Sequence, residues 1–148
     1  MPRWNKILVH HSAGFDGVVS DFEAIKRQHV EVNGWQTIGY HALIERVGDK
    51  IVDRDGRPEY MNGSHCPGQN AMALGVCLVG NFEVESVGEK MLDALVDRLT
   101  RWCVHYRISP SQIYGHRDFR STLCPGRNLY ARIASLRSQV HERVDSLK

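Results

Sequence analysis

A short apolar run, Leu74–Val79, constrains the fold of this chain more than any other segment. Its residues, Leu-Gly-Val-Cys-Leu-Val, present no polar face, which is typical of a strand covered on both sides of a sheet. We therefore expect this strand to lie in the middle of a sheet that carries packed elements on both faces.

Several other segments predict strands around this one. Lys6–His10 has the pattern of a buried strand, and Ile113–His116 has that of a short strand. Tyr40–Glu45 alternates between apolar and polar residues, and Lys50–Asp53 can return beside it as a hairpin across the turn Val47-Gly48-Asp49. A loop rich in glycine and proline then precedes the central run.

Three amphipathic segments predict the main helices. The first begins at Ser20, which forms a Ser-x-x-Glu capping box with Glu23, and ends at Gly34. Ser86 and Glu89 repeat the capping signature before the clearest stripe, formed by Leu92, Leu95, Val96, Leu99, Trp102, Cys103 and Tyr106. The last stripe consists of Leu129, Ile133, Leu136, Val140, Val144 and Leu147. Residues 1–148 are therefore predicted as one α/β domain, a mixed central β-sheet flanked by about three main helices.

Composition narrows the class of protein. A chain of 148 residues with 42% hydrophobic content suits one buried core. The net charge is +2 and the basic residues are scattered among acids, so we expect no nucleic-acid partner. No stretch approaches the roughly 18 apolar residues of a spanning helix, so we expect no membrane insertion. Met1–Lys6 lacks an apolar signal region, so we expect synthesis in the cytoplasm without a signal peptide. We also expect a monomer, and we expect Cys66 and Cys77 to be free thiols.

Two histidine and cysteine motifs suggest a metal site. One is Ile-Leu-Val-His-His-Ser, with His10 and His11; the other is Gly-His-Arg-Asp-Phe-Arg-Ser-Thr-Leu-Cys-Pro-Gly, with His116 and Cys124. Adjacent strand residues point to opposite faces, so only one of the first two histidines can reach a shared metal. Two imidazoles and one thiolate leave a fourth tetrahedral position of Zn²⁺ open for water, which predicts a metallohydrolase. The alternative for Cys124 is a buried, inert thiol.

The sequence around these motifs resembles the zinc-dependent N-acetylmuramoyl-L-alanine amidases, a type shared by small phage lysozyme-type amidases and animal peptidoglycan recognition proteins. The resemblance spans about residues 6 to 130 in family order. The matching segments are Val9-His10-His11-Ser12-Ala13, Gly34-Trp35, Ile38-Gly39-Tyr40-His41, Gly63-Ser64-His65, Leu74 to Phe82, Gly115-His116-Arg117-Asp118, Thr122 and Cys124-Pro125-Gly126.

The resemblance implies roles for individual residues. It assigns His10, His116 and Cys124 as ligands of Zn²⁺, with His11 as the bystander. It places Tyr40 and Thr122 where relatives activate water and stabilise the oxyanion; otherwise they are a strand aromatic and a hydroxyl that caps a turn.

Substrate contacts are expected from three further residues. His65 matches a substrate-facing position, with an exposed loop histidine of no role as the alternative. Trp35 lies in a matching segment, and Arg54 is one of several arginines that can pair with a stem-peptide carboxylate.

The implied reaction is hydrolysis of the amide between N-acetylmuramic acid and L-alanine of the peptidoglycan stem peptide. We expect a phage or prophage endolysin that acts on the bacterial cell wall after release. The alternatives are a cytoplasmic amidase that recycles muropeptides, a non-catalytic peptidoglycan-binding module, and a zinc-stabilised regulator of another protein.

Overall fold

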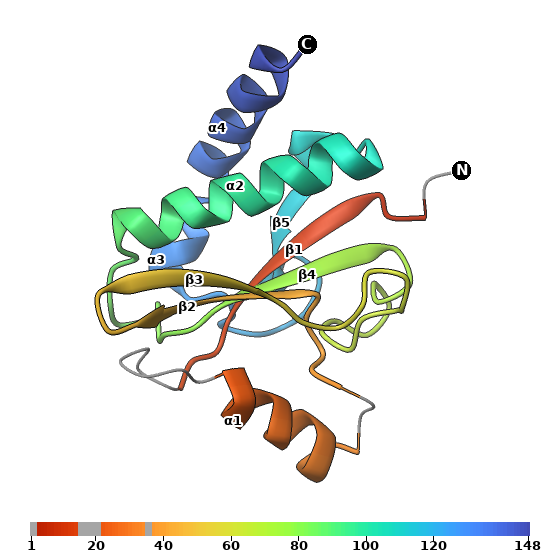
Figure 1. Ribbon diagram of the computed structural model, residues 1–148, viewed down its shortest axis with the longest axis vertical. Helices are drawn as coiled ribbons and strands as arrows, with labels where there is room; N and C mark the ends of the chain where they lie inside the picture. Colours follow the sequence, from red (N-terminus) through yellow and green to blue (C-terminus); the bar gives the residue numbers. More distant parts are fainter. Residues whose placement is uncertain (1–2, 15–21, 35–36) are drawn as a thin grey trace.

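The central run forms the strand β4 (Ala73–Leu78), and all six of its residues are buried. In the computed structural model, which describes residues 3–14, 22–34 and 37–148, the sheet has five strands in the order β3-β2-β4-β1-β5 (Figure 1). The other strands are β1 (Lys6–His11), β2 (Ala42–Val47), β3 (Lys50–Asp55) and β5 (Ile113–Gly115). The sequence-based prediction of a mid-sheet strand is confirmed.

The sheet is mixed because only one of its pairs is antiparallel. β4 runs parallel to both of its neighbours, β2 and β1, and β1 also runs parallel to β5. β2 and β3 form the predicted antiparallel hairpin. Gly48 takes φ +65° in its turn, a left-handed conformation that glycine adopts without strain.

Helices cover both faces of the sheet, with α2 and α4 on one side and α1 on the other (Figure 1). The helices and helical turns are α1 (Phe22–Arg27), the π-helical turn η1 (Gln28–Val32), α2 (Glu89–Tyr106), η2 (Pro110–Gln112), η3 (His116–Asp118), α3 (Arg127–Tyr130) and α4 (Ile133–Ser146). Fold class and the number of main helices agree with the prediction.

Strand alternation divides β4 between two cores. Leu74, Val76 and Leu78 belong to the large core beneath α2 and α4. Cys77 points the other way, into a smaller core that includes Ile25 of α1. His10 is paired in register with Cys77, and its neighbours in β1 alternate in the same way. The side chain of His10 is therefore directed away from the large core, toward the side where α1 lies.

Two predicted helix boundaries differ from the structure. Helix α2 begins at Glu89 with Gly88 as its N-cap and no side-chain cap, so the predicted capping box of Ser86 is wrong. Ser86 lies two residues before the N-cap, whereas Glu89 places its charge in the first turn, where the helix dipole favours it. The last predicted helix is split into α3 and α4, and Leu147 is 67% exposed. The predicted start at Ser20 lies outside the described residues.

The cysteines and the membrane prediction can also be compared with the structure. All four cysteines lie in the described part of the chain and are free thiols, as expected for Cys66 and Cys77. Within the same part, no helix combines the length and apolar character needed to cross a membrane.

Candidate metal centre

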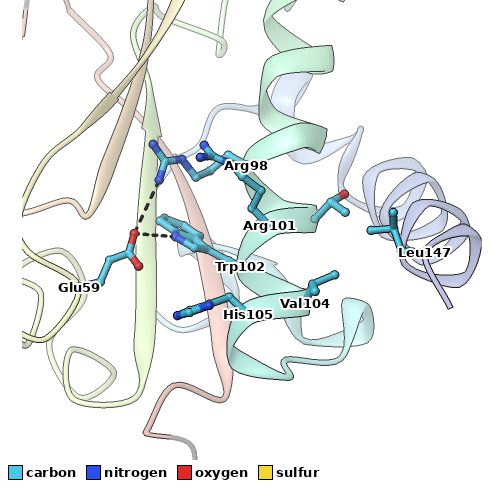
Figure 2. Close-up of a pocket in the computed structure, with 8 residues that line it drawn as sticks. Glu59, Arg98, Arg101, Trp102, Val104, His105 and Leu147 are labelled. Atoms are coloured by element: carbon cyan, nitrogen blue, oxygen red, sulfur yellow. Dashed lines mark hydrogen bonds and ion pairs between the residues drawn. The ribbon is translucent and has the colours of Figure 1, made fainter.

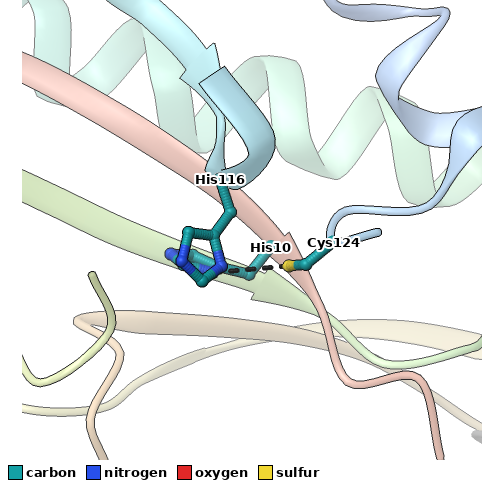
Figure 3. A group of neighbouring side chains, drawn as sticks. All are labelled: His10, His116 and Cys124. Carbon is teal, nitrogen blue, oxygen red and sulfur yellow. Dashed lines mark hydrogen bonds between the residues drawn. The ribbon is translucent and has the colours of Figure 1, made fainter. Parts of the chain in front are cut away.

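Three side chains from distant parts of the chain converge at one end of the parallel strands (Figure 3). The ligand atoms of His10, His116 and Cys124 all lie within 4.8 Å of one another. Val9 is paired in register with Gly115, so the next residues of the two strands, His10 and His116, lie side by side with ring centroids 4.6 Å apart. Cys124 completes the group from the loop before α3.

Hydrogen bonds fix the loop that carries Cys124. The backbone N–H of His11 donates to Cys124 Sγ at 3.4 Å. The N–H of Arg117 donates to the carbonyl oxygen of Cys124 at 3.0 Å. The N–H of Cys124 itself donates to Thr122 Oγ1 at 3.2 Å. Backbone hydrogen bonds from both His11 and Arg117 therefore hold Cys124 beside His10.

The imidazole of His11 takes no part in this group. Its Nδ1 accepts a hydrogen bond from the backbone N–H of Phe82 at 3.1 Å, and its ring lies 6.3 Å from the Phe82 ring. The strand alternation that excluded one of the two histidines thus leaves His10 with the candidate ligands.

Burial sets the protonation of the three groups. It lowers the pKa of His10 well below its ordinary value, helped by His65 and His116, and it also lowers the pKa of His116. Burial raises the pKa of the Cys124 thiol to about 11. Reactive cysteines have lowered pKa values, so this thiol does not resemble a free nucleophile. A bound cation is what would hold it as a thiolate.

The donor set fits Zn²⁺. Two imidazole nitrogens and a thiol sulfur are common zinc ligands, and three protein ligands leave one position open. Zn–N and Zn–S bonds of ordinary length imply about 3.6 Å between nitrogen and sulfur at tetrahedral angles. His10 Nδ1 lies 3.5 Å from Cys124 Sγ. The residues present therefore match a catalytic type of zinc site.

A cavity of about 510 Å³ opens over the three candidate ligands. It is lined by His10, His11, His29, Tyr40, Ser64, His65, Pro67, Asn70, His116, Thr122 and Cys124. The structure therefore brings the predicted catalytic residues, Tyr40 and Thr122, to the same cavity as the predicted metal ligands.

Tyr40 lies just before β2, between two histidine rings. Its ring centroid is 5.1 Å from that of His10 and 5.5 Å from that of His29. Burial raises the pKa of Tyr40 well above 10, with added contributions from Cys77, to which it is hydrogen-bonded, and Cys124. The phenol thus stays protonated at neutral pH and can act as a hydrogen-bond donor.

Thr122 caps a turn and also lines the cavity. Its Oγ1 accepts the backbone N–H of Cys124, so it caps a turn. The residue is also exposed and lines the cavity, and a hydroxyl that accepts one bond still has its own hydrogen to donate.

The three predicted substrate-contacting residues fall in different places. His65 is not an exposed loop histidine: it is 8% exposed, lines the cavity and contacts His10. Arg54 forms an ion pair with the buried Glu45 on the neighbouring strand, and it is not among the described residues that line the cavity. Trp35 lies outside the described residues.

Some cavity residues were not predicted. His29 lines the cavity, and its Nδ1 accepts the N–H of Gly39 at 2.8 Å. Asn70 Oδ1 accepts the N–H groups of His65 and Cys66, each at 2.9 Å. His29 follows Phe22 and Ile25 at helical spacing, so its position also fits the apolar side of a helix and periodicity gave no signal for a cavity residue.

A second cavity, also of about 510 Å³, lies on the α2 side of the molecule (Figure 2). At this cavity, Glu59 accepts Trp102 Nε1–H at 3.0 Å and faces Arg98 at 3.7 Å, whereas the buried Thr100 Oγ1 has no hydrogen-bond partner among the described residues. Among the described residues, the cluster able to hold a metal ion is the one around His10, and none of its members lines this second cavity.

Comparison with known proteins agrees with the geometry. The sequence profile of the Amidase_2 family, described as N-acetylmuramoyl-L-alanine amidase, matches residues 1–127. This chain belongs to that family. The match covers every element that contributes to the candidate metal centre.

Relatives include proteins named for recognition and proteins named for amide hydrolysis. Peptidoglycan-recognition protein SC2 of Drosophila melanogaster is 28% identical over 135 residues, which cover 85% of this chain and 70% of that protein. The structure of Drosophila PGRP-LB aligns with a TM-score of 0.81 at 29% identity, covering 91% of this chain and 82% of the other. The endolysin amidase LysCS of Clostridium intestinale URNW aligns with a TM-score of 0.74 at 32% identity, covering 90% and 82%.

Proposed function

We propose that this protein is a zinc-dependent amidase that hydrolyses the bond between the lactyl group of N-acetylmuramic acid and L-alanine of the stem peptide. The observation that carries the proposal is the convergence of His10, His116 and Cys124 in a cavity that also holds Tyr40. Membership of the amidase family supports the choice of substrate.

The three ligands would hold Zn²⁺, which supplies Lewis-acid chemistry that polarises a carbonyl group and makes water more acidic. The remaining tasks fall to the protein. Tyr40 presents a neutral hydroxyl, which donates a hydrogen bond to the carbonyl oxygen as negative charge develops on it. Thr122 offers a second hydroxyl at the cavity rim, beside the Cys124 backbone. Neither side chain brings a positive charge, so both act by orientation and donation.

Non-catalytic recognition of peptidoglycan is the main alternative, because relatives include recognition proteins. The complete His-His-Cys group favours catalysis, since binding of a glycopeptide alone requires no set of metal donors with an open coordination position. A cavity of about 510 Å³ is of the size that holds a small part of a larger substrate, such as the lactyl group and the first stem residues.

We further propose that the enzyme acts on intact cell wall as an endolysin, in line with its similarity to LysCS. A recycling amidase would instead prefer soluble muropeptides. Both substrates belong in the same experiment, because the comparison separates the two biological roles.

Mass spectrometry of products from purified sacculi and from a soluble muropeptide, with and without a chelator, tests the proposal. We expect peptides with a free N-terminal L-alanine and glycan with free lactyl carboxyl groups, formed only when metal is present. Binding to sacculi without cleavage would identify a recognition module. Cleavage confined to the soluble fragment would exclude the endolysin role.

A further inference from the structure

A chain of hydrogen bonds runs from the candidate metal centre to the backbone of the central strand. His10 Nε2 lies 2.9 Å from His65 Nδ1, and His65 Nε2 lies 2.9 Å from the carbonyl oxygen of Ala73. Both contacts are buried. The opposite nitrogen of the His10 ring, Nδ1, is the atom that faces Cys124 Sγ.

The chemistry of these atoms determines where the hydrogens are. A carbonyl oxygen can only accept, so His65 Nε2 must carry a hydrogen. A second hydrogen on the same ring would place a positive charge inside a buried group of imidazoles, which is costly. His65 Nδ1 is therefore bare and accepts a hydrogen bond from His10 Nε2–H. His10, neutral in turn, has its bare lone pair on Nδ1, the side of the candidate metal.

Two glycines make the slot that holds the His65 ring. A Cβ at Gly75, in the middle of β4, would lie 2.7 Å from Cγ and Cδ2 of His65. A Cβ at Gly63 would lie 2.3 Å from His65 Cδ2. Glycine inside a strand often marks the close approach of another group, and here that group is the imidazole. The slot restricts the ring to one position, from which it reaches His10.

The loop around His65 is tied down independently of the ring. The backbone N–H of Ser64 donates to the carbonyl oxygen of Gly39 at 3.0 Å, and the N–H of His65 donates to Asn70 Oδ1 at 2.9 Å. Backbone contacts therefore help to set the position of the imidazole.

We propose that His65 is a positioning residue, which holds His10 as the Nε2–H tautomer and aims its Nδ1 lone pair at the metal. The inference rests on the proposed function, since it assigns His10 as a metal ligand. It replaces the expectation that His65 contacts substrate, because both ring nitrogens are already engaged within the protein. Loss of such a hydrogen bond behind a metal-binding histidine commonly weakens metal affinity about 10- to 100-fold.

Two substitutions separate the two contacts of the ring. In His65→Asn, the side-chain oxygen replaces Nδ1 and still accepts from His10, but the contact with Ala73 is lost. In His65→Gln, the longer side chain reaches Ala73 but leaves His10 without its acceptor. We expect Asn to keep zinc affinity within about 3-fold of wild type and Gln to lose about 10- to 100-fold, measured by competition with a chromogenic chelator.

His65→Phe is the third variant, since it fills the slot with a ring that accepts nothing. We expect it to bind zinc as weakly as His65→Gln. If it fails to fold, as judged by circular dichroism and thermal unfolding, the comparison of Asn with Gln decides alone. Equal zinc affinity of the Asn and Gln variants, whether normal or reduced, would overturn the proposal.

A second measurement reads the tautomer of His10 without any metal. Long-range ¹H–¹⁵N spectra of the metal-free wild type should show His10 protonated at Nε2, with protonation shifting toward Nδ1 in His65→Gln. A wild-type His10 protonated at Nδ1 would also overturn the proposal. Neither zinc affinity nor the tautomer depends on turnover, so a protein that binds zinc and leaves peptidoglycan intact would refute the proposed function and leave this inference standing.

Discussion

The two cavities of this protein have the same volume, about 510 Å³, and opposite chemistry. On the α2 side, Glu59 accepts from Trp102 and Tyr106, and Arg98 is paired with Asp53. On the other side, His10, His116 and Cys124 direct ligand atoms at a common point. On the α2 side the charged groups are paired with one another, whereas the other cavity brings together donors of the kind that bind a cation.

Electrostatics gives the same contrast. Burial lowers the pKa values of His10 and His116, helped by neighbouring imidazoles at His10 and by Arg120 at His116, so both rings stay neutral. Arg98, by contrast, keeps its charge beside Asp53 and Asp55, which raise its pKa despite burial. Volume alone does not distinguish the two cavities; the set of metal donors at one of them does.

The largest expected effect comes from Cys124→Ser, which exchanges a thiolate for a poor zinc ligand at nearly constant volume. We expect stoichiometric zinc and amide hydrolysis to be lost together, while binding to sacculi persists because the cavity walls remain. Metal analysis, pull-down and product analysis on one preparation measure all three. Cys103→Ser, in α2, is the matched control and should keep zinc. Full zinc occupancy with normal hydrolysis in Cys124→Ser would exclude the proposed site.

Zinc should stabilise the wild-type protein but not a variant that lacks one of the proposed ligands. A ligand that binds the folded state alone stabilises it by about 4 kcal/mol when its free concentration is 1,000-fold above Kd. We expect zinc to raise the melting temperature of chelator-treated wild type, and to leave that of Cys124→Ser unchanged. Equal stabilisation of both proteins would place the bound zinc elsewhere.

Tyr40→Phe should reduce turnover about 10²- to 10³-fold, because it removes one positioned donor and leaves the metal ligands in place. Zinc content should stay at wild-type level. Tyr60→Phe serves as the control, since Tyr60 is 79% exposed. Unchanged turnover in Tyr40→Phe would reduce Tyr40 to a packing residue of the cavity wall.

Acid should lower the free energy of unfolding in a defined pH range, because a buried histidine resists protonation. Burial lowers the pKa of His41 from 6.5 to about 4, with smaller opposing effects of its neighbours. The unfolded chain then binds a proton that the folded chain does not, so stability falls as pH decreases from 6.5 toward about 4. His41→Gln should flatten this part of the curve, measured by urea unfolding of metal-free protein at several pH values. An unchanged slope would mean that His41 binds protons equally in the folded and unfolded states.

The smallest effect is expected from Glu59→Gln on the α2 side. The amide keeps an acceptor for one of the two hydrogen bonds that Glu59 receives from Trp102 and Tyr106, so the variant should lose about 1 kcal/mol in the free energy of unfolding. Zinc affinity and hydrolysis should not change. A tenfold loss of hydrolysis would show that this cavity communicates with the metal centre, and the contrast between the two cavities would then need revision.

Local pattern predicted much of the fold. The run that forms β4 and the stripe that forms α2 were recognised because strand and helix periodicities are recorded in neighbouring residues. Strand alternation also explained why His10 and His11 point to different sides. Tyr40 and Thr122 came from family resemblance, and the structure places both at the cavity; their catalytic roles stay predictions.

What the sequence did not reveal depends on contacts between distant segments. The burial of His65 arises from a slot made by Gly75 and a contact with His10, 55 positions away. His29 reaches the cavity through a π-helical turn, which no hydrophobic period specifies. The predicted cap at Ser86 was wrong because the helix begins later: the N-cap is Gly88, two residues further along the chain.

The parallel pairing of β1 with β5 has a consequence for the growing polypeptide. His10 and Cys124 are separated by 114 positions, so the sulfur ligand leaves the ribosome long after the first histidine. A nascent chain that stops short of residue 124 can present at most two of the three proposed ligands. If the proposed site binds zinc, capture by all three ligands therefore requires that synthesis has passed Cys124 and that β1, β5 and the following loop have come together.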